Sequence, residues 1–294
     1  MANTEINSKQ LLITSFLSCC LACAITLACA IMSPVFAQSH DPENNLIEFF
    51  SERGCAIGPI TKLAAIDAGF GLEKIDQLSD DARKENGTVV TGDWLVLSPA
   101  ICKMKPPKIS NRILPTDQEV LESVSAIDAY ASGGDPGCFL DSEKLQNLVQ
   151  KTRNWDEDTA FLEYLKFLSS SIISGDLSFY SDSPLRTPVG FILTSGKCAE
   201  IPLMPEIMRN HTLLVKHFDE YIRASTNAGD VICGPGESMM SMEWHDIAND
   251  ITNGKNTNAW WWFEFQIIAM GAGWYEGISP TNKGSPRPPI CHYE

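Results

Sequence analysis

Positive charge is scarce in this sequence. The chain of 294 residues carries 22 lysines and arginines against 37 aspartates and glutamates, a formal net charge of −15. Such a balance repels nucleic acid and anionic lipid, because binding to either begins with positively charged side chains. We therefore expect no nucleic-acid partner. The acidic residues are scattered along the chain, which favours a role in solubility over a dedicated cation site.

Short catalytic and cofactor motifs are also missing. The 5 histidines form no HExxH or HxH pattern, so a metallohydrolase has no support. Thr194 to Lys197 lacks the upstream glycine of a P-loop, and Ser238 is not in the GxSxG turn of an α/β-hydrolase. No dinucleotide-binding fingerprint occurs either. The sequence predicts no cofactor, assigns no catalytic residue and contains no family motif that covers the chain.

Residues 1–37 have the pattern of a secretory signal peptide. Lys9 precedes an uncharged run from Leu11 to Met32, and Pro34 then leads into Val35-Phe36-Ala37. A basic start, an apolar stretch and small residues before the cleavage site are the three parts of such a signal. We expect cleavage after Ala37 and a bacterial periplasmic or secreted location. Retention of the run as a membrane anchor is one alternative, and lipidation is another, at Cys19, Cys20, Cys23 or Cys29.

The chain after Ala37 contains six cysteines and no further run long enough to span a bilayer. None of the six forms a CxxC pair, so redox catalysis and zinc ribbons have no support. An even number of cysteines in an exported chain predicts a disulfide framework. The predicted links are Cys55–Cys102, Cys138–Cys198 and Cys233–Cys291.

A weak internal repeat selects these pairs. A short amphipathic stretch with an aromatic residue and a turn precedes Cys55, Cys138 and Cys233, and residues that favour a helix start follow each of them. Apolar extended segments end at Cys102 and Cys198, whereas the segment before Cys291 is rich in proline. We expect each link to close one unit of the repeat. The predicted units cover residues 38–108, 109–200 and 201–294.

Apolar periodicity predicts a mainly α-helical chain with short β-hairpins, of the α+β class. Helices are expected over residues 46–50, 59–68, 72–84, 116–131, 142–152, 156–173, 204–224, 237–251 and 258–270. Hairpins are expected over residues 88–97 and 177–194. The three helices and the hairpin of the first unit resemble a winged helix.

The winged-helix resemblance depends on three positions. Ala65, Gly69 and Ile75 have the spacing of a helix-turn-helix, in which a small residue lets two helices approach and glycine makes the turn. The fold implies a DNA-contacting helix over residues 72–84. That helix lacks the basic surface that DNA binding requires, so the resemblance does not change our expectation of no nucleic-acid partner. Its acidic residues are Glu73, Asp76, Asp80 and Asp81.

Methionine and histidine give the sharpest chemical alternative, a Cu(I) site. Two sets are spaced three or four residues apart on expected helices and so share a face. They are Met204, Met208 and His211, and Met239, Met242 and His245. Thioethers and imidazoles suit Cu(I). The competing interpretation is that methionine fills irregular helical cores.

Four aromatic residues are candidates for stacking on a ligand. Trp260 and Trp262 flank Trp261, and consecutive residues on a helix point about 100° apart, so the three cannot form one flat platform. Trp261 is expected in the core, which leaves Trp260 and Trp262 with Trp274 and Tyr275. Ordinary core packing is the competing explanation for all four.

These observations favour a non-catalytic binding or envelope-associated protein with a protein or peptide partner. One alternative is an exported hydrolase with a site in the last unit. That site would use His245 and an acid with Ser238 or Ser241. The other alternative is the periplasmic Cu(I)-binding protein.

Overall fold

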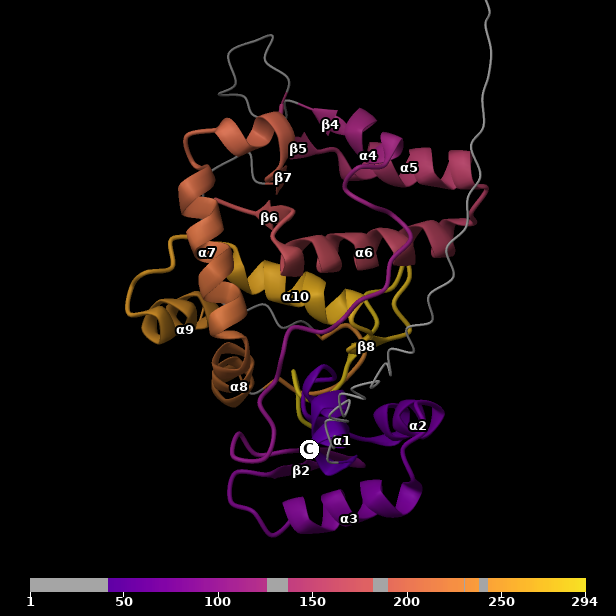
Figure 1. The fold of residues 1–294 in the computed structure, drawn as a ribbon, viewed down its shortest axis with the longest axis vertical. Helices are drawn as coiled ribbons and strands as arrows, with labels where there is room; N and C mark the ends of the chain where they lie inside the picture. The colour runs from indigo at the N-terminus through magenta and orange to yellow at the C-terminus, as the bar shows by residue number, and fades with distance from the viewer. Residues whose placement is uncertain (1–41, 126–136, 182–189, 230, 238–242) are drawn as a thin grey trace, which may run out of the picture. The chain divides into compact units, whose positions relative to one another are not determined.

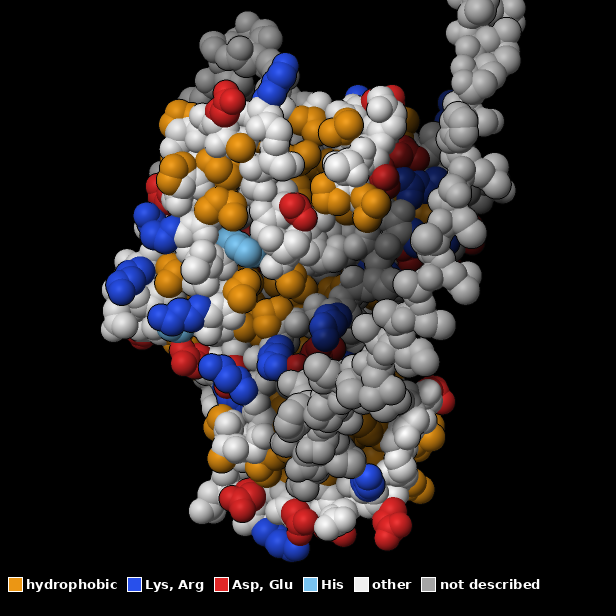
Figure 2. Space-filling view, in the orientation of Figure 1, with side chains coloured by type: hydrophobic (Ala, Val, Ile, Leu, Met, Phe, Trp, Pro, Cys, Tyr) orange, Lys and Arg blue, Asp and Glu red, His pale blue; other side chains and the backbone are white. Residues whose placement is uncertain are grey.

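A computed structural model describes residues 42–125, 137–181, 190–229, 231–237 and 243–294. All described residues belong to one compact unit. That unit is a mixed α+β fold of helices and small antiparallel sheets (Figure 1). Acidic and basic side chains are interspersed on the face drawn in Figure 2, as the scattered charges of the sequence predict.

The first part of the unit combines three helices with a three-stranded sheet. The helices are α1 (Pro42–Ser51), α2 (Pro59–Asp67) and α3 (Leu72–Ala82). The strands β1 (Ala56–Ile57), β2 (Val89–Thr91) and β3 (Trp94–Val96) have the order β1-β3-β2. Helix α2 begins at Pro59 because proline suits the first helical position, and Thr61 Oγ1 accepts a hydrogen bond from Gly58 N at 2.9 Å.

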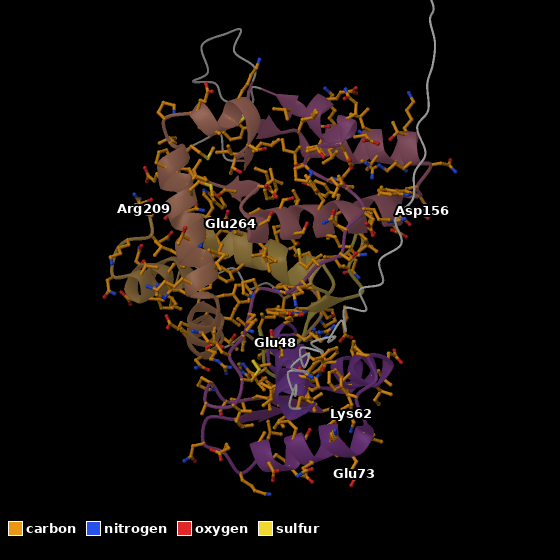
Figure 3. The ribbon with its side chains drawn as sticks, in the orientation of Figure 1. Glu48, Lys62, Glu73, Asp156, Arg209 and Glu264 are labelled. Atoms are coloured by element: carbon orange, nitrogen blue, oxygen red, sulfur yellow. A yellow bond between two sulfur atoms is a disulfide. The ribbon has the colours of Figure 1, made fainter. Side chains whose placement is uncertain are left out.

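The middle part is a four-stranded antiparallel sheet with three helices. The helices are α4 (Gln118–Glu122), α5 (Ser142–Arg153) and α6 (Glu157–Ser174). The sheet order is β4-β5-β7-β6, with β4 (Val124–Ser125), β5 (Phe139–Leu140), β6 (Leu177–Phe179) and β7 (Phe191–Leu193). Side chains cap two of the helices: Asp141 accepts from Lys144 N at 3.0 Å and Asp156, labelled in Figure 3, accepts from Thr159 N at 2.6 Å.

The helix predicted over residues 116–131 is present but ends earlier than predicted. Helix α4 ends at Glu122, and the chain continues as strand β4, in which Val124 pairs with Leu140. Pairing with a strand that lies further along the chain has overridden the local helical pattern. Residues 126–131 lie outside the described residues, as does the middle of the hairpin predicted over residues 177–194.

The last part of the unit contains four α-helices and a two-stranded sheet. The elements are the 3₁₀ turn η1 (Gly196–Glu200), α7 (Met204–Lys216), α8 (Phe218–Gly229), α9 (Glu243–Thr252), α10 (Trp261–Gly271), β8 (Tyr275–Glu276) and β9 (Ser285–Pro286). The single helix predicted over residues 204–224 is two helices, with a break at His217. Helix α10 begins later than predicted because Asn258 Oδ1 accepts from Trp260 N at 3.0 Å and holds a turn before it.

Three disulfides join the pairs that the sequence predicts, Cys55–Cys102, Cys138–Cys198 and Cys233–Cys291, with separations of 47, 60 and 58 residues. One main hydrophobic core nevertheless includes residues from all three predicted units, among them Phe50, Phe167 and Phe265. The disulfides close loops, and the shared core joins the loops to one another.

Helices α6 and α10 pack side by side at the centre of this core (Figure 1). Gly271 permits the close approach, since a Cβ atom there would lie 2.0 Å from Ser169 Oγ. The same hydroxyl lies within hydrogen-bonding distance of two carbonyl oxygens, Leu165 O at 2.7 Å and Ile267 O at 2.6 Å, between which its one proton is shared. None of the helices in the described part of the chain has the length and apolar composition that a membrane crossing requires.

Candidate functional site

A cavity of about 440 Å³ lies between the β2–β3 hairpin, helix α8 and the C-terminal segment. We call it the hairpin cleft. Its lining residues are Gly87, Val89, Thr91, Val96, Pro99, Met104, Arg223, Thr226, Asn227, Pro289, Cys291 and His292. Its volume is in the range of roughly 300–1,000 Å³ that is usual for sites that bind small molecules.

One wall of the hairpin cleft is a face of the hairpin. Val89 pairs with Val96 across the two strands, and Thr91 follows two residues after Val89. These side chains share a face because successive residues of a strand point to opposite sides. Val90 pairs with Leu95 and points the other way. With Met104 and Pro99, this wall is mainly apolar.

The opposite wall is polar and comes from helix α8. Arg223, Thr226 and Asn227 are three and four residues apart and so share one side of the helix. The guanidinium of Arg223 is held by three acceptors: Asp219 Oδ1 at 2.9 Å from Nε, Leu97 O at 3.0 Å from Nη1 and Cys102 O at 2.9 Å from Nη2.

Asp219 balances the charge of Arg223 and makes a second contact of its own. Its Oδ1 accepts a hydrogen bond from Met104 N at 2.7 Å, so the buried ion pair connects α8 to the loop that carries the first disulfide. A guanidinium that is paired with a carboxylate and bonded through three of its N–H groups attracts an anion much less than a free one would. The hairpin cleft is therefore polar on this side without a strong excess of charge.

The third wall is the C-terminal segment, which is fixed at several points. Thr226 Oγ1 donates to Pro289 O at 2.8 Å, and His292 N donates to Val231 O at 2.9 Å next to the Cys233–Cys291 disulfide. Thr91 Oγ1 accepts from Tyr293 N, so the end of the chain lies beside β2 (Figure 1). These contacts hold all three walls of the cleft in place before any ligand binds.

Comparison of this chain with protein-family models, with curated proteins and with solved structures gives no match. No relative assigns a ligand to the hairpin cleft. The functional argument therefore depends on the chemistry of the lining residues.

An acid with a strongly raised pKa lies elsewhere, in the core. Glu264 is on α10 beside β6 (Figure 3) and is only 3% exposed. Its carboxylate accepts from Ser178 Oγ at 2.8 Å, Phe179 N at 2.8 Å and Asn258 Nδ2 at 3.1 Å. Burial raises the pKa of Glu264 to about 7, against the opposing effect of these three donors. Glu264 lines neither the hairpin cleft nor the other cavities described here, and its hydrogen bonds join α10 to β6 and to Asn258.

The first methionine and histidine set lies on helix α7, and its members have different surroundings. Met204 is buried in a small cluster with Tyr180 and Ile207, whereas Met208 is exposed. His211 Nε2 lies 2.9 Å from Ile173 O, and its ring packs on the backbone of the α6 C-cap. Within the described residues, no group of three or more histidine, cysteine, aspartate or glutamate side chains is placed to hold a metal ion.

The second set cannot be compared in the same way. Met239 and Met242 lie outside the described residues, as do Ser238 and Ser241. His245 is in helix α9, where only the backbone is described. The Cu(I) and hydrolase alternatives therefore stay predictions.

The four stacking candidates are packed in the protein. Trp274 and Tyr275 are buried, and Trp260 and Trp262 are half-buried with ring centroids 5.4 Å apart. Trp260 also contacts Phe179 at 5.5 Å between centroids. None of the four lines a cavity that the structure describes.

Sequence reasoning did not identify the hairpin cleft, because its lining comes from segments far apart in the chain. Residues 87–104 supply the hairpin and the following loop, residues 223–227 supply α8, and residues 289–292 supply the C-terminal wall. Two local signals were present: the Gly92-Asp93 turn, which predicts the hairpin, and the disulfide that fixes Cys291.

Proposed function

We propose that this chain is an exported, non-catalytic binding protein that holds a peptide segment of a partner in the hairpin cleft. The observation that carries the proposal is the pairing of an apolar wall with a polar wall across a cavity of about 440 Å³. An extended peptide presents side chains and backbone amides to its surroundings at the same time, and so needs both kinds of wall.

The lining residues match these two requirements. Val89, Val96 and Met104 offer an apolar surface for a side chain. The carboxamide of Asn227 carries both donors and an acceptor, as does a peptide amide. Because Asp219 balances Arg223, a neutral backbone suits the cleft better than a strongly ionic small molecule would.

Export is part of the proposal and has two supports. The leader over residues 1–37 has the parts of a bacterial secretory signal, and three disulfides favour an oxidising compartment such as the periplasm or the cell exterior. We also retain the three related units and the winged-helix likeness of the first one as proposals. Each predicted unit is closed by one disulfide, which supports the repeat. The three units share the main hydrophobic core, so they would be packed together and not be folded separately.

Two neighbouring valines provide the test. Val89 lines the hairpin cleft and Val90 points away from it, yet their exposed fractions are similar, 47% and 55%. Val89→Asp and Val90→Asp should therefore lower the β-propensity of the strand to a similar extent, and each adds one negative charge. We expect Val89→Asp to weaken binding of blocked apolar peptides about tenfold or more, because it places an unpaired charge on the apolar wall. Val90→Asp should bind like the wild type.

The measurement is fluorescence polarisation with a library of labelled, acetylated and amidated peptides, with thermal unfolding of each variant as the control for folding. A library in which no peptide binds the wild-type protein would overturn the proposal. Equal loss of affinity in the two variants would place the peptide outside the hairpin cleft.

A further inference from the structure

A second cavity adjoins the hairpin cleft. It has a volume of about 370 Å³, and we call it the tip cavity because it lies at the turn of the β2–β3 hairpin. Its lining residues are Pro59, Ile60, Gly92, Asp93, Trp94, Glu276 and Tyr293.

The two cavities are neighbours along two separate segments of the chain. On the hairpin, Thr91 lines the hairpin cleft and the next residue, Gly92, lines the tip cavity. In the C-terminal segment, His292 lines the hairpin cleft and the next residue, Tyr293, lines the tip cavity. The hydrogen bonds between Thr91 and the Tyr293 backbone lie at the junction. A peptide held in the hairpin cleft can therefore reach the tip cavity with a side chain only a few residues along.

The tip cavity combines an apolar floor with two carboxylates. Pro59, Ile60 and the ring of Tyr293 supply the apolar surface. Neither Asp93 nor Glu276 forms an ion pair with any residue of the described ranges. The carboxylates of Asp93 and Glu276 therefore add negative charge to a cavity whose other lining residues are partly apolar.

Two further side chains, Tyr293 and Arg287, interact electrostatically with these carboxylates. Burial is the first cause of the raised pKa of Tyr293, and Glu276 and Asp93 raise it further while Arg287 opposes them, so both carboxylates act on the same hydroxyl. The guanidinium of Arg287 lies over the ring of Trp94, 5.0 Å from its centroid. It donates hydrogen bonds to Gly273 O and Pro288 O. Arg287 is not part of the lining, in which Asp93 and Glu276 are the charged side chains and both are acidic.

We infer that the tip cavity binds the lysine or arginine side chain of a peptide whose neighbouring apolar residue occupies the hairpin cleft. The inference rests on the proposed function, and it specifies the ligand as a peptide with an apolar and a basic residue close together. The aliphatic part of the basic side chain packs on Ile60 and Pro59. Its cationic end lies between Asp93 and Glu276, where the face of Tyr293 adds a cation–π contact.

The experiment uses blocked peptides with one leucine and one lysine, separated by one, two or three glycines, and matched peptides with glutamate in place of lysine. The best lysine peptide should bind the wild-type protein about tenfold more tightly than its glutamate match. This preference should shrink in high salt, because exposed charges are screened.

Two double variants separate the tip cavity from the general negative charge of the protein. Asp93→Asn with Glu276→Gln should remove the preference for lysine while leucine peptides still bind. Asp80→Asn with Asp81→Asn changes the net charge equally on the exposed side of α3, outside both cavities, and should keep the preference.

The outcomes distinguish this inference from the proposed function. Equal binding of lysine and glutamate peptides, or an unchanged preference in the Asp93 and Glu276 double variant, would overturn the inference and leave the peptide-binding function standing. Failure of every peptide to bind the wild-type protein would overturn both.

Discussion

The buried carboxyl of Glu264 should make the stability of this fold depend on pH, and Glu264→Gln should remove that dependence. In the fold the carboxyl has a pKa of about 7, compared with an ordinary value of 4.5, because burial disfavours the charged form. The protonated carboxyl therefore stabilises the folded state relative to the unfolded state. That stabilisation is complete below pH 4.5 and is lost as the pH rises through about 7.

The expected magnitude follows from the two pKa values. Each tenfold change in proton affinity corresponds to about 1.4 kcal/mol, so the gap between 4.5 and about 7 corresponds to about 3 kcal/mol. Wild-type protein should lose about that much free energy of unfolding between pH 4.5 and pH 9 through this one residue.

The hydrogen bonds of Glu264 predict how the glutamine variant differs. Oε1 accepts from both Ser178 and Phe179, and a glutamine oxygen can keep these two bonds. The amide nitrogen would replace Oε2 and would face Asn258 Nδ2, which is also a donor. Loss of that bond costs about 1–3 kcal/mol. Glu264→Gln should be less stable than the wild type at pH 5, and the difference should shrink or reverse by pH 8.5.

The assay is urea unfolding of both proteins with the disulfides intact, from pH 5 to pH 9. All other groups are common to the two proteins, so the difference between the two curves isolates Glu264. A difference in free energy of unfolding that stays constant across this range would refute the reasoning, because it would mean that Glu264 does not change its charge there.

Two further substitutions test packing and the polar wall of the hairpin cleft. Gly271→Ala should lower the free energy of unfolding by about 1–3 kcal/mol, because the new methyl group would collide with Ser169 Oγ. The added methyl group would also lie 2.5 Å from Ser169 Cβ and 2.9 Å from Leu165 O. Equal stability of this variant and the wild type in denaturant unfolding would contradict the close approach of α6 and α10. Arg223→Met should cost about 3 kcal/mol, because it leaves the buried Asp219 carboxylate without its cation. The Arg223→Met, Asp219→Asn double variant should recover most of that loss, and a double variant no more stable than the single one would contradict the pairing.

The elements that sequence reasoning predicted well have their ends fixed by nearby residues. Helix α2 begins at Pro59, and Asp141 and Asp156 cap α5 and α6, within a residue or two of the predicted starts. The cysteine pairing was predictable for a related reason, since both partners of each disulfide lie in one segment of the chain, 47, 60 and 58 residues apart.

The features that sequence reasoning missed depend on distant partners. Residues 123–125 follow a helical pattern, but Val124 pairs with Leu140, so the chain forms a strand there. The break at His217 separates α7 from α8 and lets Phe218 and Tyr221 enter the core. Glu264 did leave a signal, a single acid inside the apolar run from Trp260 to Met270, but only its partners on β6 and at Asn258 explain why it is tolerated.

The predicted disulfide framework and the unpredicted cleft are physically connected. The first disulfide fixes the loop whose carbonyl groups hold Arg223, and the third fixes the C-terminal segment that forms the third wall. A cleft whose walls are already held requires little ordering when a ligand binds, and less free energy is then lost to conformational entropy. The covalent links that support export therefore also prepare the hairpin cleft for binding. Reduction of the disulfides should weaken peptide binding before it unfolds the core around α6 and α10.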